Sequence, residues 1–324
     1  NLVGQQLEFS SPDNFLLSFQ RGDRDKMLFI DKYQAEYFLE LNNNLSWNFS
    51  YTNTEMQPVG ALVLKYQDPI SQETSYLQEL RTNEVGFRFR FAPNEQYIQG
   101  RSYRMPIYNK YPVFTLNLVA GLKNEGLKAG FFGGDYAYQR ASLNVFKRFY
   151  MSLLGTMRFE AEAGKIWGNG LPYFLLHLPR ANQSFAYRTG AFNMMNYQEF
   201  VSDEYVSVNV EHFFNGFFLN KIPLLRKLKL REVVTFKGIY GRLSDRNNPN
   251  KNPELIQFIE EEGEIITHTL EDKPYLEAGF GVGNIAKFLR IDAVRRLTYL
   301  DHPDVPSLFG VRGLGLRMKI KFEF

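Results

Sequence analysis

Histidine is the side chain that most often transfers protons near neutral pH, and this chain of 324 residues contains four. They are His177, His212, His268 and His302, and each is well separated from the others along the sequence. Cysteine is absent, which excludes disulfides, thiolate metal ligands and cysteine nucleophiles. No HExxH, GxSxG, GxxxxGKS or GxxxxGKT string occurs either. We therefore predict a protein that is not an enzyme, with no catalytic residue, no metal site and no cofactor.

Two of the histidines have neighbours that bear on this prediction. The string LDHPDVP places Asp301 and Asp304 beside His302, a combination that could bind a divalent cation. Asp and Pro also favour turns, and a turn is the interpretation that we prefer. His177, in FLLHLPR, is expected to pack within a long loop, and His212 to be structural. An enzyme would instead require His177 or His302 to lie within hydrogen-bond reach of a serine or an aspartate at the rim of the barrel.

Charged side chains recur at alternate positions in several segments, so each set would lie on one face of a strand. The set comprises Arg88, Arg90, Arg158, Glu160, Glu162, Glu211, Arg317, Lys319, Lys321 and Glu323. On the wall of an open pore, its excess of basic groups would favour anions. Alternatively, Arg–Glu pairs brace the wall or hold a loop in place, since buried charges require partners. We favour bracing, because the 169–202 connection is long enough to fill the pore.

The elements that would position these residues are strands, as the last segment, GLGLRMKIKFEF, indicates. From Leu314 on, apolar residues alternate with glycine or charged residues, which is the period of a strand. The same alternation occurs in 84–91, 114–120, 156–163, 206–211 and 276–283. The last of these contains GFGVG, which looks like a dinucleotide-binding loop but lacks the helix that should follow it. Glycines on one face of a strand explain that string better.

Composition indicates which kind of strand protein this is. Hydrophobic residues make up 44% of the chain and aromatic residues 16%, with 30 Phe and 19 Tyr. No window approaches the roughly 18 consecutive apolar residues of a membrane helix. Many aromatics without long apolar runs are typical of transmembrane strands, where only alternate residues face lipid. The net charge of +3 gives no reason to expect nucleic acid as a partner.

The predicted fold is an all-β, transmembrane antiparallel β-barrel that occupies residues 1–324 as a single domain in the bacterial outer membrane. The candidate strands are 4–10, 13–21, 27–41, 45–53, 58–67, 80–92, 97–105, 111–122, 135–149, 153–168, 203–217, 227–243, 274–284, 288–299 and 310–324. Bacterial single-chain barrels have an even number of strands, so we expect sixteen rather than these fifteen.

Long and short connections alternate in the C-terminal half, as extracellular loops and periplasmic turns do in such barrels. The polar segment 244–273 is expected to be an extracellular loop, and 169–202 to fold into the lumen. NKIPLLRKL, from Asn220, reads as a compact turn in which Pro223 starts a helical turn and basic residues can lie against lipid phosphates.

The chain ends with aromatic residues at the last and third-last positions of a predicted strand. This ending resembles the signal that the outer-membrane barrel assembly machinery reads, with Leu316, Met318, Ile320, Phe322 and Phe324 as the alternating residues. The resemblance implies that this machinery is a partner, alongside outer-membrane lipid and lipopolysaccharide.

Several longer stretches support a family assignment, among them FAPNEQYIQG, NKYPVFTLNLVAGLK, YLEAGFGVGNIAKFLRIDAVRRLTYLDHPD and FGVRGLGL. The most specific runs from Phe192 to Gly241 and contains FNMMNYQEFVSDEYVSVNVEHFFNGFFLNKIPLLRKLKL. Together they resemble an uncharacterised outer-membrane family of Bacteroidota, in which a carboxypeptidase-regulatory-like domain precedes a C-terminal barrel. That preceding periplasmic domain is expected to be absent from this chain.

The same region is similar, more distantly, to the BamA/TamA superfamily of sixteen-stranded barrels that assemble or translocate outer-membrane proteins. In that superfamily a long loop precedes the last five strands and enters the lumen with an Arg-Gly-Phe/Tyr tip. Here Met195, Asn196 and Tyr197 stand at the nearest place, and Arg188, in YRTGAF, is the candidate to supply the guanidinium. The resemblance implies a non-enzymatic role in assembly or translocation, with envelope proteins as partners and a weak seam between first and last strands. The alternative is a porin-like or selective channel with a basic lumen.

Overall fold

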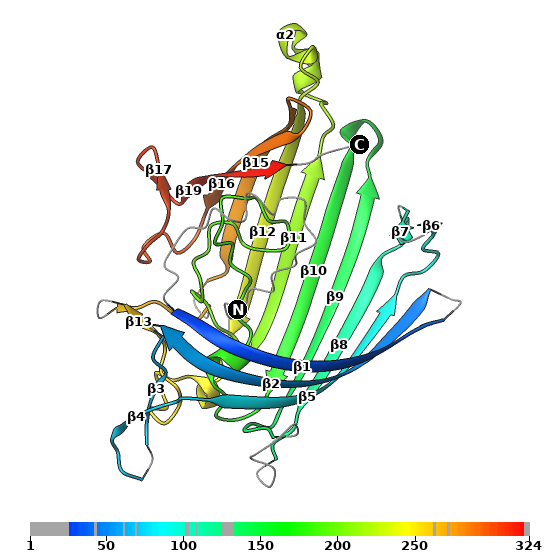
Figure 1. The fold of residues 1–324 in the computed structure, drawn as a ribbon. Coiled ribbons are helices and arrows are strands. Elements are labelled where there is room, and N and C mark those ends of the chain that lie inside the picture. The colour runs from blue at the N-terminus through cyan, green and yellow to red at the C-terminus, as the bar shows by residue number, and fades with distance from the viewer. Residues whose placement is uncertain are drawn as a thin grey trace.

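The computed structural model describes residues 26–41, 44–60, 62–68, 70–100, 104–107, 109–124, 133–261, 264–270 and 273–320. Eleven strands form one antiparallel sheet in which each strand pairs with its neighbours along the chain (Figure 1). They are β1 (Lys26–Leu41), β2 (Leu45–Gly60), β5 (Leu80–Phe91), β8 (Val113–Gly121), β9 (Tyr138–Tyr150), β10 (Thr156–Trp167), β11 (Glu204–Phe213), β12 (Arg231–Arg242), β15 (Tyr275–Ile285), β16 (Leu289–Arg296) and β19 (Leu314–Ile320). The all-β antiparallel prediction is confirmed.

Short elements occupy the connections. Four two-stranded pairs form from β3 (Lys65–Gln67) with β4 (Thr74–Tyr76), β6 (Tyr97–Gln99) with β7 (Arg104–Pro106), β13 (Glu260–Glu261) with β14 (Glu264–Ile265), and β17 (Ser307–Leu308) with β18 (Val311–Arg312). The helical turns are η1 (Ser152–Leu154), η2 (Tyr173–Leu175), η3 (Leu219–Lys221), α2 (Pro223–Arg226) and η4 (Asp245–Asn247). Pro223 begins α2, as its missing N–H and fixed φ predict. Within the part of the chain that the structure describes, no helix has the length and apolarity needed to cross a membrane.

The register puts the charged positions of neighbouring strands on one shared face. Arg158 lies opposite Arg148 of β9 and Glu211 of β11, so all three point to the concave side of the sheet. The next residue, Phe159, points to the convex side, because successive side chains of a strand alternate. Convex-side residues such as Leu143 and Leu316 remain 45% and 43% exposed, as lipid-facing residues of a barrel would in the absence of lipid. We call the concave side the lumen.

Eleven of the fifteen predicted strands correspond to the eleven strands of the sheet. The predictions 4–10 and 13–21 lie outside the described residues. The prediction 97–105 is wrong, since those residues fall in the short β6–β7 pair, and three residues cannot span a bilayer that requires about 9–11. The prediction 58–67 is also wrong, because β2 continues to Gly60 and β3 then turns away to pair with β4. The described residues thus supply eleven of the sixteen expected strands.

The connections between the strands fall into two groups, one at each end of the sheet. One end has 61–79, 122–137, 168–203, 243–274 and 297–313. The other has 42–44, 92–112, 151–155, 214–230 and 286–288, and α2 projects from it in Figure 1. Among the described residues β1 and β19 do not pair with each other, so the closing seam is not part of the described sheet.

Candidate functional site

The connection between β10 and β11, residues 168–203, folds back over the lumen side of the sheet, and we call it the plug. In Figure 1 it is the green segment enclosed by the curved sheet. Its first part carries η2, and Tyr173, Phe174 and Leu175 are buried in a core with Phe258 of the 243–274 connection. The prediction that 169–202 folds inward agrees with this position.

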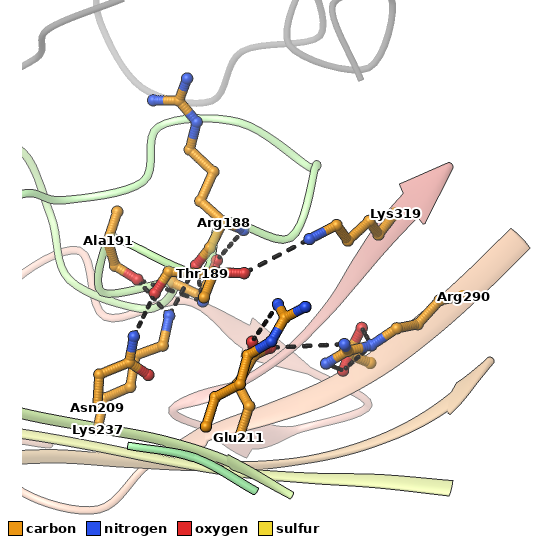
Figure 2. A network of polar contacts seen from close by, with 11 residues as sticks. Arg188, Thr189, Ala191, Asn209, Glu211, Lys237, Arg290 and Lys319 are labelled. Atoms are coloured by element: carbon orange, nitrogen blue, oxygen red, sulfur yellow. Dashed lines mark hydrogen bonds and ion pairs between the residues drawn. The ribbon is translucent and has the colours of Figure 1, made fainter. Parts of the chain in front are cut away.

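The tip of the plug is held by polar side chains of the lumen wall (Figure 2). Lys237 of β12 donates through Nζ to the carbonyl oxygens of Arg188, at 2.7 Å, and Ala191, at 2.6 Å. Asn209 of β11 donates to the carbonyl of Thr189 at 2.8 Å, and the Oγ1 of Thr189 lies 3.4 Å from Nζ of Lys319. Because Lys237 is almost fully buried, these two carbonyls replace the water that its ammonium group would otherwise need.

A second set of contacts clamps the peptide at Asn193. The carboxylate of Glu277, in β15, accepts from the backbone N–H of Asn193 at 2.8 Å and of Met194 at 3.0 Å. From the other side, Arg317 of β19 donates through Nη2 to the carbonyl of Asn193 at 2.6 Å. The plug backbone is therefore bound by an anion and a cation from two different strands, which fixes its position more tightly than apolar packing alone.

A third contact joins the end of the plug to β16 and to the 297–313 connection. Arg296 is fully buried and forms a two-pronged ion pair with Glu199, with Nη1 to Oε2 at 2.9 Å and Nη2 to Oε1 at 2.5 Å. Nδ1 of His302 lies 2.9 Å from the same carboxylate. Burial by itself would raise the pKa of Glu199, but hydrogen bonds from His302 and Arg296 hold that pKa below its usual range. Glu199 is therefore ionised at neutral pH and pairs with Arg296.

The plug also reaches the backbone edge of the last described strand. Ala186 forms a parallel bridge with Met318, in which the N–H of Tyr187 donates to the Met318 carbonyl at 2.6 Å. The N–H of Met318 donates in turn to the carbonyl of Phe185 at 2.9 Å. This edge is the one that faces away from β16, so Phe185–Tyr187 lies where a further strand would pair.

Among the described residues, a hollow of about 1020 Å³ lies beside the plug on the lumen side. Its wall carries polar and charged side chains of both signs, including Lys32, Glu84, Arg88, Asn117, Arg140, Glu160, Glu162 and Arg180. Tyr205 lies over Gly164 and donates to Glu162 at 2.5 Å, and Tyr138 lies in the same way over Gly121 and donates to Glu84. A Cβ at either glycine would collide with the ring, so these glycines make room for tyrosines of the neighbouring strand.

The predicted lumen charges divide into three groups. Arg88, Glu160 and Glu162 line the hollow, and Arg158 lies 3.9 Å from Glu211. Arg90 is in an ion pair of 2.7 Å with Glu95, just beyond the end of β5. Arg317 and Lys319 contact the plug, as described above, whereas Lys321 lies outside the described residues. Several of these side chains therefore contact the wall or the plug, and bracing of the lumen stays a prediction.

Arg188 and Tyr197, the residues expected to anchor the plug, have smaller roles than expected. Arg188 contributes its backbone, with its N–H donating to Asn193 at 2.9 Å, and its guanidinium points away from the strands (Figure 2). The hydroxyl of Tyr197 accepts from Gln198 at 3.3 Å. Sequence reasoning missed Glu199, Lys237, Glu277 and Arg296, which hold the plug instead. Alternation alone would have placed Lys237 and Glu277 on the inner faces of their strands.

The four histidines lie in the plug, on β11, and in the 243–274 and 297–313 connections. His177 is stacked on Tyr205 with ring centroids 3.4 Å apart, and burial lowers its pKa to about 3, so its imidazole is neutral. Its Nδ1 lies 3.4 Å from Oγ of Ser202, and that serine is fully buried. His212 lies 2.8 Å from the carbonyl of Leu154. Within the described ranges, no cluster of three or more His, Cys, Asp or Glu residues could hold a metal ion, and His302 pairs with Glu199 rather than with its neighbouring aspartates.

The C-terminal signal residues are only partly described. Leu316 and Met318 remain exposed on the convex side of β19, and Ile320 is half-buried. Phe322 and Phe324 lie outside the described residues.

The fold is a BamA-like β-barrel fold. The crystal structure of BamA from Haemophilus ducreyi lacking POTRA domains 1-3 superposes with a TM-score of 0.52 over 93% of this chain, at 10% sequence identity. The chain spans 57% of that BamA chain. A model described as "Family of unknown function (DUF5686) C-terminal domain" matches residues 31–246, and the chain belongs to this family. The comparison with curated proteins gives no match.

Proposed function

We propose that this chain is an outer-membrane β-barrel of a Gram-negative bacterium that acts without enzymatic chemistry in the assembly or translocation of other envelope proteins. The BamA-like fold supports a location in the outer membrane. The resemblance of the sequence to Bacteroidota barrels with a carboxypeptidase-regulatory-like domain supports the same location. Its partners would be outer-membrane lipid and lipopolysaccharide, the barrel assembly machinery and client proteins in extended conformation.

The observation that supports this role most directly is the occupied edge of β19. An unpaired strand edge binds extended peptides by adding them as a further strand. Here the bridge between Ala186 and Met318 covers that edge with a segment of the same chain. Its two backbone hydrogen bonds contribute together only about 1–3 kcal/mol, so a longer client strand with more bonds can displace the segment.

A disulfide that locks this contact tests the proposal. Because the chain has no cysteine, Ala186→Cys with Met318→Cys creates a single reversible crosslink. In cells depleted of the natural protein, we expect the oxidised variant to lower outer-membrane barrel and lipoprotein levels, and a reductant to restore them. The control is Leu143→Cys with Ala163→Cys, register partners in β9 and β10 that lie away from the plug. Unchanged levels both on depletion and with the locked variant would contradict the assembly role.

A second candidate function is transport through the lumen, and the hollow of about 1020 Å³ beside the plug favours it. Planar-bilayer conductance distinguishes the two functions, when it is measured before and after residues 175–195 are replaced by a short Gly–Ser linker. Large, stable channels in the intact protein would favour transport. A closed intact protein that conducts only after the replacement would favour the assembly role with a filled lumen.

A further inference from the structure

The connection between β11 and β12, residues 214–230, is a projecting element with an unusual surface, and we call it the knob. It contains η3 and α2 and extends beyond the strand ends (Figure 1). Four of its large apolar side chains, Phe218, Ile222, Leu224 and Leu228, are exposed, and Leu224 is 78% exposed. Apolar side chains gathered in this way on a projecting element indicate a surface that is covered by something other than water.

The knob also carries a positive charge. Lys221, Arg226, Lys227 and Lys229 stand between its apolar residues, and no Asp or Glu occurs from Phe213 to Arg231. Interleaved basic and apolar side chains are the composition of segments that lie in the interface of an anionic membrane. An acidic protein partner would have to match both the basic and the apolar side chains, over a surface only one helical turn wide.

The apolar side of the knob is continuous with the convex, lipid-facing side of the sheet. On that side His212 contacts Phe214, with ring centroids 4.1 Å apart, and Phe214 contacts Phe218 at 5.1 Å. This column of three rings runs from β11 onto the knob. Aromatic residues at this level of a barrel form the girdle at the boundary between acyl chains and headgroups.

The base of the knob is rigidly attached to the wall. The buried carboxylate of Glu232, at the start of β12, accepts from the backbone N–H of Gly216 at 2.9 Å, of Phe218 at 3.1 Å and of Leu219. Lys221 packs its ammonium group 4.0 Å from the centre of the Phe217 ring. The knob is therefore held in one orientation relative to the strands, which lowers the entropy lost when it binds.

We propose that the knob rests on the membrane surface beside the barrel, and that it binds the headgroups of anionic phospholipids. The apolar side chains enter the boundary between headgroups and acyl chains, and the four basic side chains lie against lipid phosphates. The knob thereby determines how deeply this end of the barrel sits in the bilayer and which lipids surround β11 and β12.

The test uses the cysteine-free full chain with Leu224→Cys labelled by an environment-sensitive fluorophore. The protein is reconstituted in nanodiscs of phosphatidylcholine alone, or of phosphatidylcholine mixed with phosphatidylglycerol. We expect a blue shift of the emission in the anionic nanodiscs relative to the zwitterionic ones. Changing the four basic residues of the knob to Gln should remove that difference, and because all four are exposed the barrel should still fold.

Two further labelled sites separate failure of this proposal from failure of the barrel assignment. Ile70 is 93% exposed in a connection at the opposite end of the sheet, and a fluorophore at Ile70→Cys should report an aqueous environment in both kinds of nanodisc. Leu143→Cys, on the convex side of β9, should report an apolar environment in both. If the Leu143 label reports water, the membrane assignment of the sheet is wrong. If Leu143 reports lipid and Leu224 reports water in both lipids, the knob does not bind the membrane, and an equal blue shift in both would overturn its preference for anionic headgroups.

Discussion

Buried charged residues hold the plug in its position within the lumen. Lys237, Glu277, Arg296 and Arg317 point into the lumen, and each is buried. A charge removed from water is stable only with a partner and with its remaining hydrogen-bonding groups satisfied. Lys237, Glu277 and Arg317 find that partner in the plug backbone, and Arg296 finds it in the carboxylate of Glu199. Removal of one partner leaves the other charge buried, which costs about 3–5 kcal/mol in comparable cases.

The pair of Glu199 and Arg296 predicts that acid loosens the plug. The pKa of Glu199 in the folded protein is below its ordinary value of 4.5. Ionised Glu199 therefore contributes its full stabilisation of the folded protein above pH 4.5. This contribution is lost as the pH falls through the lowered pKa. We expect proteolysis of the plug in detergent to be slow at neutral pH and to accelerate only in strong acid.

The variant Glu199→Gln checks the origin of this pH dependence. It should be cleaved faster than the natural chain already at neutral pH and should lose the acceleration in acid. Glu264→Gln, an exposed residue of another connection, is the matched control and should behave like the natural chain. If the acid response persists unchanged in Glu199→Gln, a group other than Glu199 causes that response.

At the scale of elements, close fit between the plug and β19 depends on an inward-facing glycine. A Cβ at Gly315 would lie 2.8 Å from Sδ and 2.9 Å from Cε of Met194. The absence of a side chain at Gly315 makes room for the fully buried side chain of Met194. The flexible end of Met194 can move by the small amount that one methyl requires, but not by the amount that a branched side chain requires.

We therefore predict that Gly315→Val destabilises the docked plug by about 1–3 kcal/mol, the usual cost of overpacking. Hydrogen exchange of the plug amides near Asn193 should increase in this variant. Adding Met194→Ala should restore much of the protection, because it removes the atoms that collide. Gly190→Ala is the control, since no atom lies within 4 Å of the added Cβ, and an equal effect of both changes would contradict the packing argument.

A second prediction at this scale concerns the base of the knob. Glu232→Gln removes the charge that three backbone N–H groups share, and a hydrogen bond to a charged group contributes about 1.5–3 kcal/mol. We expect faster hydrogen exchange at Gly216 and Phe218 with no change at Tyr187 in the plug. An unchanged rate at Gly216 would show that the turn holds its shape without the carboxylate.

At the scale of the whole molecule, the proposed outer-membrane location requires the sheet to separate lipid from a polar interior. Leu143 and Asn144 are neighbours in β9 that point to opposite sides, and Asn144 donates to Glu160 at 2.9 Å in the lumen. Arg placed on the lipid side of a barrel costs about 2–4 kcal/mol near the bilayer midplane, whereas lumen positions tolerate charge.

Leu143→Arg should therefore lower the free energy of unfolding in lipid vesicles, measured by reversible urea titration, far more than Asn144→Arg. The second variant places the new guanidinium near Glu160 and Glu162 and should be close to neutral. Equal costs for the two changes would contradict the assignment of the convex side to lipid.

The alternation of polar and apolar residues determined the strands, their two faces and the barrel class, because side-chain direction in a strand depends only on the parity of the position. It also places Arg158, Glu160 and Glu162 on one face, which is the lumen side. The same local rule failed at 97–105, where β6 ends at Gln99, directly before Gly100, and the segment pairs only with the three residues of β7. Sequence could not show that Glu199 meets Arg296 or that Ala186 meets Met318, since the partners of each pair lie far apart along the chain. Only the tertiary structure decided them, because the path of the plug across the sheet sets which backbone and carboxyl groups each buried charge can reach.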